Sequence, residues 1–576
     1  MAYGEERAPA VTGGGHSQDS SAGPTSPAGP PRPAGGRHRR RAGLLGHSAV
    51  MAAGSLVSRV TGFLRTAVIA AALGGISVVG DAYTTAMFVP GMVYELLLGG
   101  ILASVVVPLL VRAHTHDPDA GEAYTHRLLS LAVLALGVTT ALAVAAAPLL
   151  TALLAGSDAT PASRDLITRL SYLILPTIFF YGLAALLAAV LNTRDHFAAP
   201  MWSPILNNIV VIATFGLYIA IYGTRLRTPE QMPAGAVLLL GVGTFLGIVV
   251  QSLGLWPALR RVGFRWRWRF DFAALRLGEL ARLGGWAFCY VLVSQVGVLV
   301  MIRLANEASA SGHAGPLIFN NTYLLMMMAH GIIAVSIITA LMPRLSRAAA
   351  QRDWAEFVGD LSRGTRLSVV ALAPISVAYA VLALPIARTL FEYGAFSGTD
   401  AVATSLVLLA ASLALIPYSA SQLYTFAFYA LPDTRTPALI NIPAVVVRIG
   451  MQIWLATVFG AAFVAAGLMI GNAVSFLLAA VLSGIVLRRR VGPVGMRQLL
   501  DTFWRVVAAA LGAALVGLVT SNLVHAGLGE AKPAAVAQLL IGGAAIVAAY
   551  LGFALLLRVR EVRDLVTLVR SKLGRS

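Results

Sequence analysis

Four charged side chains lie in an otherwise apolar stretch, residues 55–108, that is long enough for two membrane-spanning helices. They are Arg59, Arg65, Asp81 and Glu95. An ionisable group inside a membrane helix costs several kcal/mol unless it faces a protein interior or a water-filled cavity. This stretch therefore predicts a polar binding site within a membrane protein.

Arg59 and Arg65 are six residues apart, which in an α-helix separates them by about 9 Å along the axis on one broad flank. Guanidinium groups bind phosphate oxygens in a bidentate manner, so the pair suits a ligand with two anionic groups, such as a pyrophosphate. We expect Asp81, at the start of the next helix, to pair with one arginine when no ligand is bound. The alternative is that both arginines reach the membrane surface or cap neighbouring helices.

The composition indicates an integral membrane protein. Of the 576 residues, 58% are hydrophobic and 12% are charged, and the mean hydropathy is +0.79. A soluble domain carries about 25% charged residues. The net charge of +18 comes almost entirely from arginine, and in a polytopic membrane protein it favours loops that face anionic lipid over nucleic-acid binding. The single cysteine, Cys289, excludes a disulfide within the chain and a cysteine-based metal site.

Fourteen apolar segments are each long enough to cross about 30 Å of hydrocarbon as a helix. They cover residues 48–73, 82–112, 128–155, 167–191, 201–222, 234–258, 284–305, 317–343, 367–390, 401–431, 437–459, 463–487, 502–524 and 534–557. The sequence therefore predicts an all-α polytopic membrane protein with fourteen transmembrane helices. We expect two six-helix lobes around a central cavity, followed by two C-terminal helices.

Composition also divides the chain into segments. The predicted segments are a disordered, basic cytoplasmic tail (1–42), a first lobe with helices 1–6 (43–259), an amphipathic cytoplasmic linker (260–283), a second lobe with helices 7–12 (284–490), helices 13 and 14 (491–560) and a C-terminal cytoplasmic tail (561–576). In the linker, Arg and Trp alternate from Arg265 to Phe270. We expect an interfacial helix there, with its tryptophans at the level of the lipid headgroups.

The loops predict the orientation in the membrane. If the N-terminal tail is cytoplasmic, the inner loops carry the arginine clusters of residues 260–269, 344–366 and 488–490. The outer loops then carry very few basic residues, with Arg225 and Arg227 as the main exceptions. This bias places both termini in the cytoplasm.

Arg448 is the corresponding charged residue in the second half of the chain. It lies about ten residues from either end of its predicted helix, too far to reach the membrane surface, so it must face a partner, a cavity or a ligand. We find no Walker lysine motif, no Ser–His–Asp arrangement and no pair of carboxylates in mid-membrane. An enzyme is therefore the least expected class, and no catalytic residue, cofactor or metal is predicted.

Several segments together resemble the MurJ (MviN) family of bacterial lipid II flippases, which belongs to the multidrug/oligosaccharidyl-lipid/polysaccharide exporter superfamily. The segments are SRVTGFLR from Ser58, GDAY from Gly80, PxxxYELLLGG from Pro90, AVLNTRDHFAAPMWSPILNN from Ala189, HGIIAVSIITALMPRLSR from His330, EYGAFS from Glu392 and YALPDTRTPALIN from Tyr429. Their order and spacing, more than any single fragment, carry the resemblance.

The resemblance implies a multi-pass protein of the bacterial cytoplasmic (inner) membrane with a central cationic cavity. Its expected substrate is lipid II, an undecaprenyl-pyrophosphate-linked disaccharide pentapeptide, moved from the inner to the outer leaflet by alternating access. Helices 13 and 14 would form a groove for the lipid tail. Arg59, Arg65 and Asp81 match the family's functional Arg, Arg and Asp.

The chain also departs from the family pattern. Many members carry an arginine pair where this chain has Tyr94 and Glu95, and we count both, together with Arg448, as candidate substrate-binding residues. Some members bind sodium in the second lobe, and Arg448 and Gln452 fall where such members carry Asn and Asp. We expect the Arg448 guanidinium to stand in for the cation; the alternative is that it faces the cavity and contacts the substrate.

Two other functions stay open at this point. One is export of another undecaprenyl-pyrophosphate-linked sugar, and the other is a non-transporting membrane scaffold for cell-wall assembly. The partners considered are lipid II, anionic membrane lipids and cell-wall synthesis proteins, and no nucleic acid is expected. Arg59→Ala separates the flippase from the scaffold, because only the flippase requires a cationic cavity.

Overall fold

The computed structural model describes Gly54, residues 56–96, Leu110, Ala113, Asp119, 121–194, 196–275, 277–493 and 496–564. Within these ranges, only the backbone is described for residues 273–274, 277–284 and 496–497. The predicted N-terminal tail, 1–42, lies outside the described residues, as does most of the C-terminal tail. All regular secondary structure in the described ranges is helical.

A first set of helices covers the chain up to residue 261. It consists of the helix Leu56–Leu73, α2 (Val78–Glu95), α4 (Glu122–Ala145), α5 (Ala147–Leu154), α6 (Pro161–Ile174), α7 (Thr177–Thr193), α8 (Ala198–Tyr222), the 3₁₀ turn η2 (Pro229–Gln231), α9 (Ala234–Leu253) and α10 (Trp256–Arg261). Within this set α8 packs on α9, α2 on α6, and α4 on α7. Pro176, which cannot donate a backbone hydrogen bond, separates α6 from α7.

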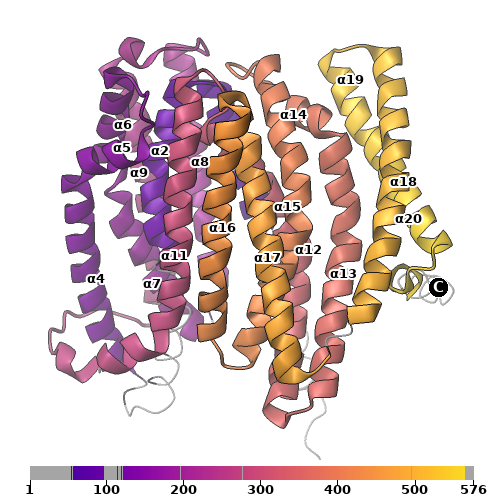
Figure 1. Ribbon diagram of the computed structural model, residues 1–576. Coiled ribbons are helices and arrows are strands. Elements are labelled where there is room, and N and C mark those ends of the chain that lie inside the picture. Colours follow the sequence, from indigo (N-terminus) through magenta and orange to yellow (C-terminus); the bar gives the residue numbers. More distant parts are fainter. Residues whose placement is uncertain are drawn as a thin grey trace, which may run out of the picture. The chain divides into compact units, whose positions relative to one another are not determined.

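A second set covers the rest of the chain. It consists of η3 (Phe272–Leu275), α11 (Leu277–Ala310), α12 (Pro316–Gln351), α13 (Trp354–Val381), α14 (Ala383–Phe391), α15 (Gly398–Ala430), α16 (Arg435–Phe459), η4 (Ala461–Phe463), α17 (Val464–Val491), α18 (Met496–Leu528), α19 (Lys532–Ala537), the π-helical turn η5 (Gln538–Gly542) and α20 (Gly543–Leu556). The helices α11 to α17 pack mainly on one another, whereas α18 packs on α13 and α20 (Figure 1).

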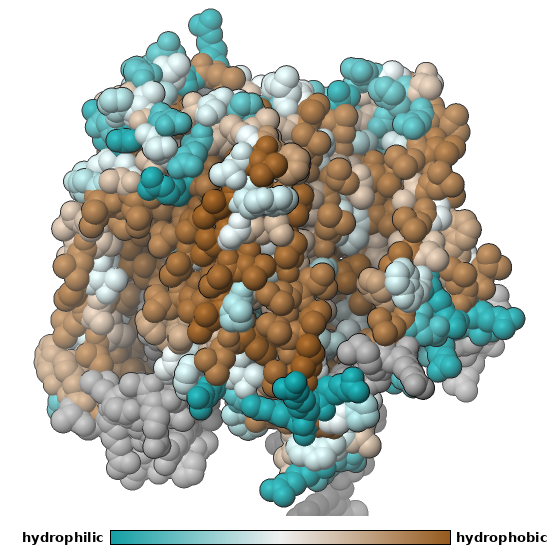
Figure 2. All heavy atoms as spheres, viewed as in Figure 1, coloured by the Kyte–Doolittle hydropathy of each residue, from teal (hydrophilic) through white to brown (hydrophobic). Residues whose placement is uncertain are grey.

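The predicted membrane spans agree with these helices. In the described residues, 13 helices are long and apolar enough to cross a membrane, and each falls on one predicted span. The remaining prediction, 82–112, begins within α2 and continues into residues that lie outside the described ranges. Figure 2 shows apolar side chains covering the middle of the helices, with polar side chains toward both ends. The all-α polytopic fold is therefore confirmed.

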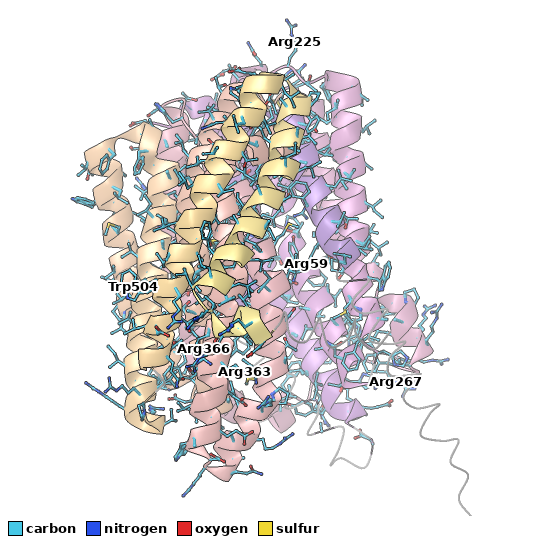
Figure 3. All side chains as sticks on the ribbon, turned by 90° about the vertical axis from the view of Figure 1, so that its right-hand side faces the viewer. Arg59, Arg225, Arg267, Arg363, Arg366 and Trp504 are labelled. Atoms are coloured by element: carbon cyan, nitrogen blue, oxygen red, sulfur yellow. The ribbon has the colours of Figure 1, made fainter. Side chains whose placement is uncertain are left out.

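Two labelled arginines mark the ends of the helices: Arg225 lies at one end and Arg267 at the other (Figure 3). At the Arg225 end, the turn after the first helix lies beside two other loops. A Cβ on Gly74 would meet Leu226, and a Cβ on Gly394 would meet Thr224 and the carbonyl oxygen of Ala71. The loops of both helix sets therefore meet at the Arg225 end.

The prediction of an interfacial helix in the linker is wrong for residues 264–271, which are not helical. The alternating Arg–Trp sequence has the two-residue period of an extended chain. Phe264 faces the protein and Trp266 is half-buried, while Arg265 and Arg267 are exposed. The backbone N–H groups of Arg267 and Arg269 donate to α4, so the segment is held by a neighbouring helix instead of by its own hydrogen bonds.

Candidate functional site

Asp81 lies in the first turns of α2 and is buried, with 1% of its surface exposed. Its Oδ2 accepts a hydrogen bond from Ser309 Oγ at 2.6 Å, and its Oδ1 accepts one from the backbone N–H of Leu317 at 2.7 Å. Leu317 is in the first turn of α12, where backbone N–H groups have no partner within the helix and the helix dipole favours a negative charge. Asp81 therefore caps α12 and joins the first helix set to the second.

Among the described residues, Asp81 does not form the expected ion pair with an arginine in this conformation. Both carboxylate oxygens are occupied by Ser309 and Leu317. Arg59 instead donates from Nη2 to the carbonyl oxygen of Gly331 in α12, at 3.4 Å. The helix dipole of α12 replaces the guanidinium as the positive partner of the carboxylate.

A second buried carboxylate joins the two helix sets in the opposite direction. Asp400, in the first turn of α15, accepts hydrogen bonds from the backbone N–H groups of Gly75 at 3.1 Å and Ile76 at 3.0 Å. It also forms a capping box with Ser397. The capping-box pattern was visible in the sequence, but its contact with the distant turn before α2 was not.

A buried amide completes these contacts. Asn306 of α11 exchanges hydrogen bonds with Thr85 of α2 at 3.0 and 3.1 Å and donates to the carbonyl oxygen of Leu154 at 3.0 Å. We call Asp81, Asp400, Asn306 and their partners the Arg225-end closure. It holds the two helix sets together at that end through buried, mutually satisfied polar groups.

Arg65 lies beside a polar pocket within the first helix set and α12. The pocket is lined by Arg65, Tyr83, Asn207, Thr244, Asn320 and Asn321, among others. Arg65 Nε, Asn207 Oδ1 and both polar side-chain atoms of Asn321 are buried and have no hydrogen-bond partner in the described part of the chain. Unpaired buried polar groups are rare in proteins and point to a ligand or a water site.

Glu95 and Arg448 approach neighbouring residues of α11 from opposite helix sets. Gln295 Nε2 donates to Glu95 Oε2 at 3.5 Å, and Arg448 Nη2 donates to the carbonyl oxygen of Ser294 at 3.0 Å. A Cβ on Gly297 would lie 1.7 Å from Arg448 Nη2, so this glycine makes room for the guanidinium. The structure thus brings these two predicted residues to one stretch of α11.

Gln452 lies one helical turn after Arg448 and is buried. Its Nε2 donates to the carbonyl oxygen of Leu468 at 3.0 Å and to Asn472 Oδ1 at 3.3 Å, both in α17. Arg448 and Gln452 therefore link α16 to α11 and α17 through carbonyl groups. Tyr94 has a different neighbour, since its ring lies 4.9 Å from that of Tyr181 in α7.

The six predicted site residues do not form one cluster. Asp81 and Glu95 are fourteen residues apart in α2, about 21 Å along a helix axis, and Asp81 belongs to the Arg225-end closure. Arg59 lies between the two ends in Figure 3. Asp400, Asn306 and the pairing role of Ser309 were not predicted from the sequence, because short polar side chains in apolar helices carry no signal of which distant helix they meet.

Comparison with known proteins identifies the family. A profile described as lipid II flippase MurJ matches residues 69–534. The lipid II flippase MurJ of Burkholderia cenocepacia is 28% identical over 80% of this chain and 86% of its own length, and the probable lipid II flippase MurJ of Vibrio cholerae is 28% identical over 82% and 88%.

Solved structures share the fold. A lipid II flippase MurJ in an inward closed conformation superposes with a TM-score of 0.70 at 20% identity, over 90% of this chain and 100% of that one. An inward-facing multidrug resistance MATE transporter superposes with a TM-score of 0.59 at 14% identity, over 76% of this chain and 95% of that one. The profile match covers well over half of the sequence, and the chain therefore belongs to the MurJ family.

Proposed function

We propose that this protein moves lipid II from the inner to the outer leaflet of the bacterial cytoplasmic membrane by alternating access. Family membership and the polytopic helical fold support transport. The observation that carries the substrate-binding assignment is the Arg65 pocket, where a guanidinium and three unpaired amide atoms line one buried space. Such groups suit a ligand that is both anionic and rich in hydroxyl and amide groups.

In this proposal Arg59 and Arg65 bind the pyrophosphate. Arg59 donates one hydrogen bond, to the neutral carbonyl oxygen of Gly331 at 3.4 Å. Among the described residues neither arginine forms a salt bridge. Neither guanidinium therefore has to break an ion pair before it binds phosphate. Because each arginine presents a planar fork of donors, lysine is a poor replacement.

Replacement of the arginines tests the assignment. We expect Arg59→Ala and Arg65→Ala each to abolish rescue of cells depleted of their own flippase, and to remove lipid II exposure at the outer leaflet. Membrane insertion should stay normal. Arg59→Lys and Arg65→Lys should not restore activity, whereas the matched control Arg225→Ala, at an exposed loop position, should be fully active. An active Arg59→Ala/Arg65→Ala double variant contradicts the assignment.

The direction of transport requires the Arg267 end to face the cytoplasm, which we propose from the arginine bias of the loops. Single cysteines at Ser157 and Ser397, both exposed, should react with an impermeant thiol reagent added outside intact cells. A cysteine at Ser346 should react only after the membrane is permeabilised. All three belong in a Cys289→Ser background, and the reverse labelling pattern contradicts the proposed orientation.

A further inference from the structure

The non-helical segment 264–271, which we call the strap, lies along α4 at the Arg267 end. The backbone N–H of Arg267 donates to His126 Nδ1 at 3.3 Å, and that of Arg269 donates to Ser130 Oγ at 3.0 Å. His126 and Ser130 are one helical turn apart, so they meet alternate N–H groups of an extended chain. The rings of His126 and Phe264 also stack at 5.2 Å. The strap is therefore fixed in register on α4.

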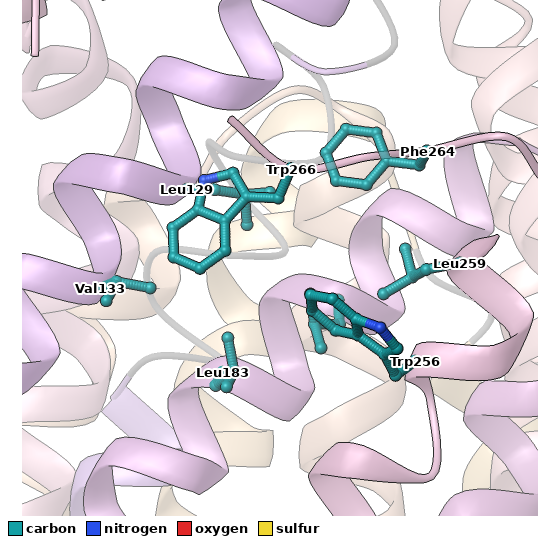
Figure 4. A pocket seen from close by; sticks show the side chains of 8 residues that line it. Leu129, Val133, Leu183, Trp256, Leu259, Phe264 and Trp266 are labelled. Atoms are coloured by element: carbon teal, nitrogen blue, oxygen red, sulfur yellow. The ribbon is translucent and has the colours of Figure 1, made fainter. Parts of the chain in front are cut away.

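An apolar pocket lies between the strap, α4, α7 and α10 (Figure 4). It is lined by Leu129, Val133, Leu183, Leu187, Trp256 and Trp266, together with Leu259 and Phe264. Apart from the indole N–H groups, these side chains offer nothing polar. The indole N–H of Trp266 is buried and has no acceptor in the described part of the chain. The pocket is thus an apolar space with a buried indole donor in its wall.

The surface around the pocket is positively charged. Arg265, Arg267 and Arg269 are exposed, and among the described residues none of them forms a salt bridge. Arg260 lies over the ring of Trp256 at 5.9 Å, at the edge of the pocket.

The nearby acidic groups do not cancel this charge. Arg127 donates to Asp271 at 2.7 Å, and this hydrogen bond lowers the pKa of the Asp271 carboxyl. Glu122 lies 3.8 Å from Arg194. Asp119 accepts from the backbone N–H groups of Gly121 and Ala123. Two of these three acids therefore have an arginine of their own, and the strap arginines remain in excess among the described residues.

Two aromatic rings complete the surface. Trp268 is 52% exposed and Phe270 is 63% exposed, and the rings stack with centroids 5.9 Å apart. Exposed tryptophan beside arginine is typical of the boundary between hydrocarbon and headgroups. The strap therefore lies where a lipid has its phosphate and ester groups.

We propose that the pocket and strap form a binding site for one anionic phospholipid of the leaflet at the Arg267 end. The first methylene groups of an acyl chain enter the pocket, an ester carbonyl accepts the Trp266 N–H, and the phosphate lies on the strap arginines. A phospholipid fits better than a polyprenyl tail, because an acyl chain begins with a carbonyl acceptor and a polyprenyl chain has none along its length. This site is separate from Arg59 and Arg65 and goes beyond the proposed transport function.

The test uses the full chain in nanodiscs and lipids with brominated acyl chains, which quench tryptophan fluorescence on contact. The chain has eight tryptophans, so the Trp266 contribution is the difference between the unaltered protein and Trp266→Phe. We expect brominated phosphatidylglycerol to quench that contribution at much lower mole fractions than brominated phosphatidylcholine. Arg265→Gln with Arg267→Gln should reduce this preference roughly tenfold or more, since each arginine near a membrane surface contributes about 1 kcal/mol toward anionic lipid.

Filling the pocket provides the second arm. Leu183→Phe should reduce quenching of Trp266 by either lipid, whereas the matched control Leu515→Phe, at a position that is 65% exposed, should not. Arg225→Gln is the control for the charge variants. Equal quenching by the two lipids, or unchanged quenching in Leu183→Phe, overturns the proposal. Displacement of the brominated lipid by unlabelled undecaprenyl phosphate, but not by unlabelled phosphatidylglycerol, overturns it in favour of a polyprenyl site.

Discussion

The Arg225-end closure and the Arg65 pocket are both polar and both buried, yet their polar groups are used in opposite ways. In the closure, each oxygen of Asp81 accepts a hydrogen bond, as does each oxygen of Asp400. In the pocket, Arg65 Nε and both polar side-chain atoms of Asn321 have no partner among the described residues. In the closure the polar groups form hydrogen bonds that join the two helix sets, whereas in the pocket the polar groups remain available to bind a ligand.

The difference separates two roles that the sequence analysis had combined. A buried carboxylate whose hydrogen bonds are all made stabilises one conformation, because opening it exposes unpaired groups that each cost about 1–3 kcal/mol. A buried amide without a partner destabilises the empty state and favours a ligand. This contrast supports our proposal that Asp81 acts in conformational control, while Arg59 and Arg65 bind the substrate.

The largest effect on lipid II exposure is expected when the closure is prevented from opening. Thr85→Cys with Asn306→Cys, in a Cys289→Ser background, places two thiols where side chains now exchange hydrogen bonds. A short cleavable thiol cross-linker should abolish lipid II exposure, and reduction should restore it. Thr151→Cys with Thr168→Cys, whose hydroxyls are 2.9 Å apart within the first helix set, is the matched control and should stay active when cross-linked. Full activity of the cross-linked Thr85–Asn306 pair contradicts a moving closure.

A smaller effect is expected when the closure is only weakened. Asp81→Ala leaves the Leu317 N–H and the Ser309 hydroxyl without their acceptor, at a cost of about 1–3 kcal/mol to the closed state. A cysteine at Thr85, which is buried, should then react roughly tenfold faster with a water-soluble thiol reagent. Asp165→Ala is the control, since Asp165 pairs with Arg169 at the surface. An unchanged labelling rate in Asp81→Ala would show that the cap does not hold the closure shut.

The smallest effect concerns Arg448 and sodium. In the unaltered protein, lipid II exposure is expected to be independent of sodium. The Arg448 guanidinium donates a hydrogen bond to the carbonyl oxygen of Ser294, and Gln452 donates to α17. Neither side chain offers a carboxylate oxygen, and the fixed guanidinium repels a cation. Replacing sodium by potassium should leave lipid II exposure unchanged. Arg448→Asn with Gln452→Asp should introduce sodium dependence, whereas the control Arg435→Asn should not. Sodium-dependent activity of the unaltered protein contradicts the stand-in hypothesis.

Most of the fold follows from the sequence, because long apolar runs in a membrane have few alternatives to helix. The linker was the exception. Hydropathy and charge predicted a helix at residues 264–271, but the hydrogen bonds that hold this non-helical segment come from His126 and Ser130 of α4. A local pattern cannot report a partner that is more than a hundred residues away.

The candidate site was predicted by residue type but not by arrangement. Intramembrane charge identified Arg59, Arg65, Asp81 and Arg448 as residues that need an explanation. Arg59, Asp81 and Arg448 each have a backbone partner, at Gly331, Leu317 and Ser294 respectively. A backbone carbonyl or N–H is the same at every position of a sequence. The division between closure and pocket therefore became visible only from the packing.

The contact between Gly297 and Arg448 predicts how these two positions vary among related sequences. A Cβ at residue 297 would lie 1.7 Å from Arg448 Nη2, so a side chain at 297 would displace the guanidinium from its position beside Ser294. The two positions are therefore expected to covary among relatives.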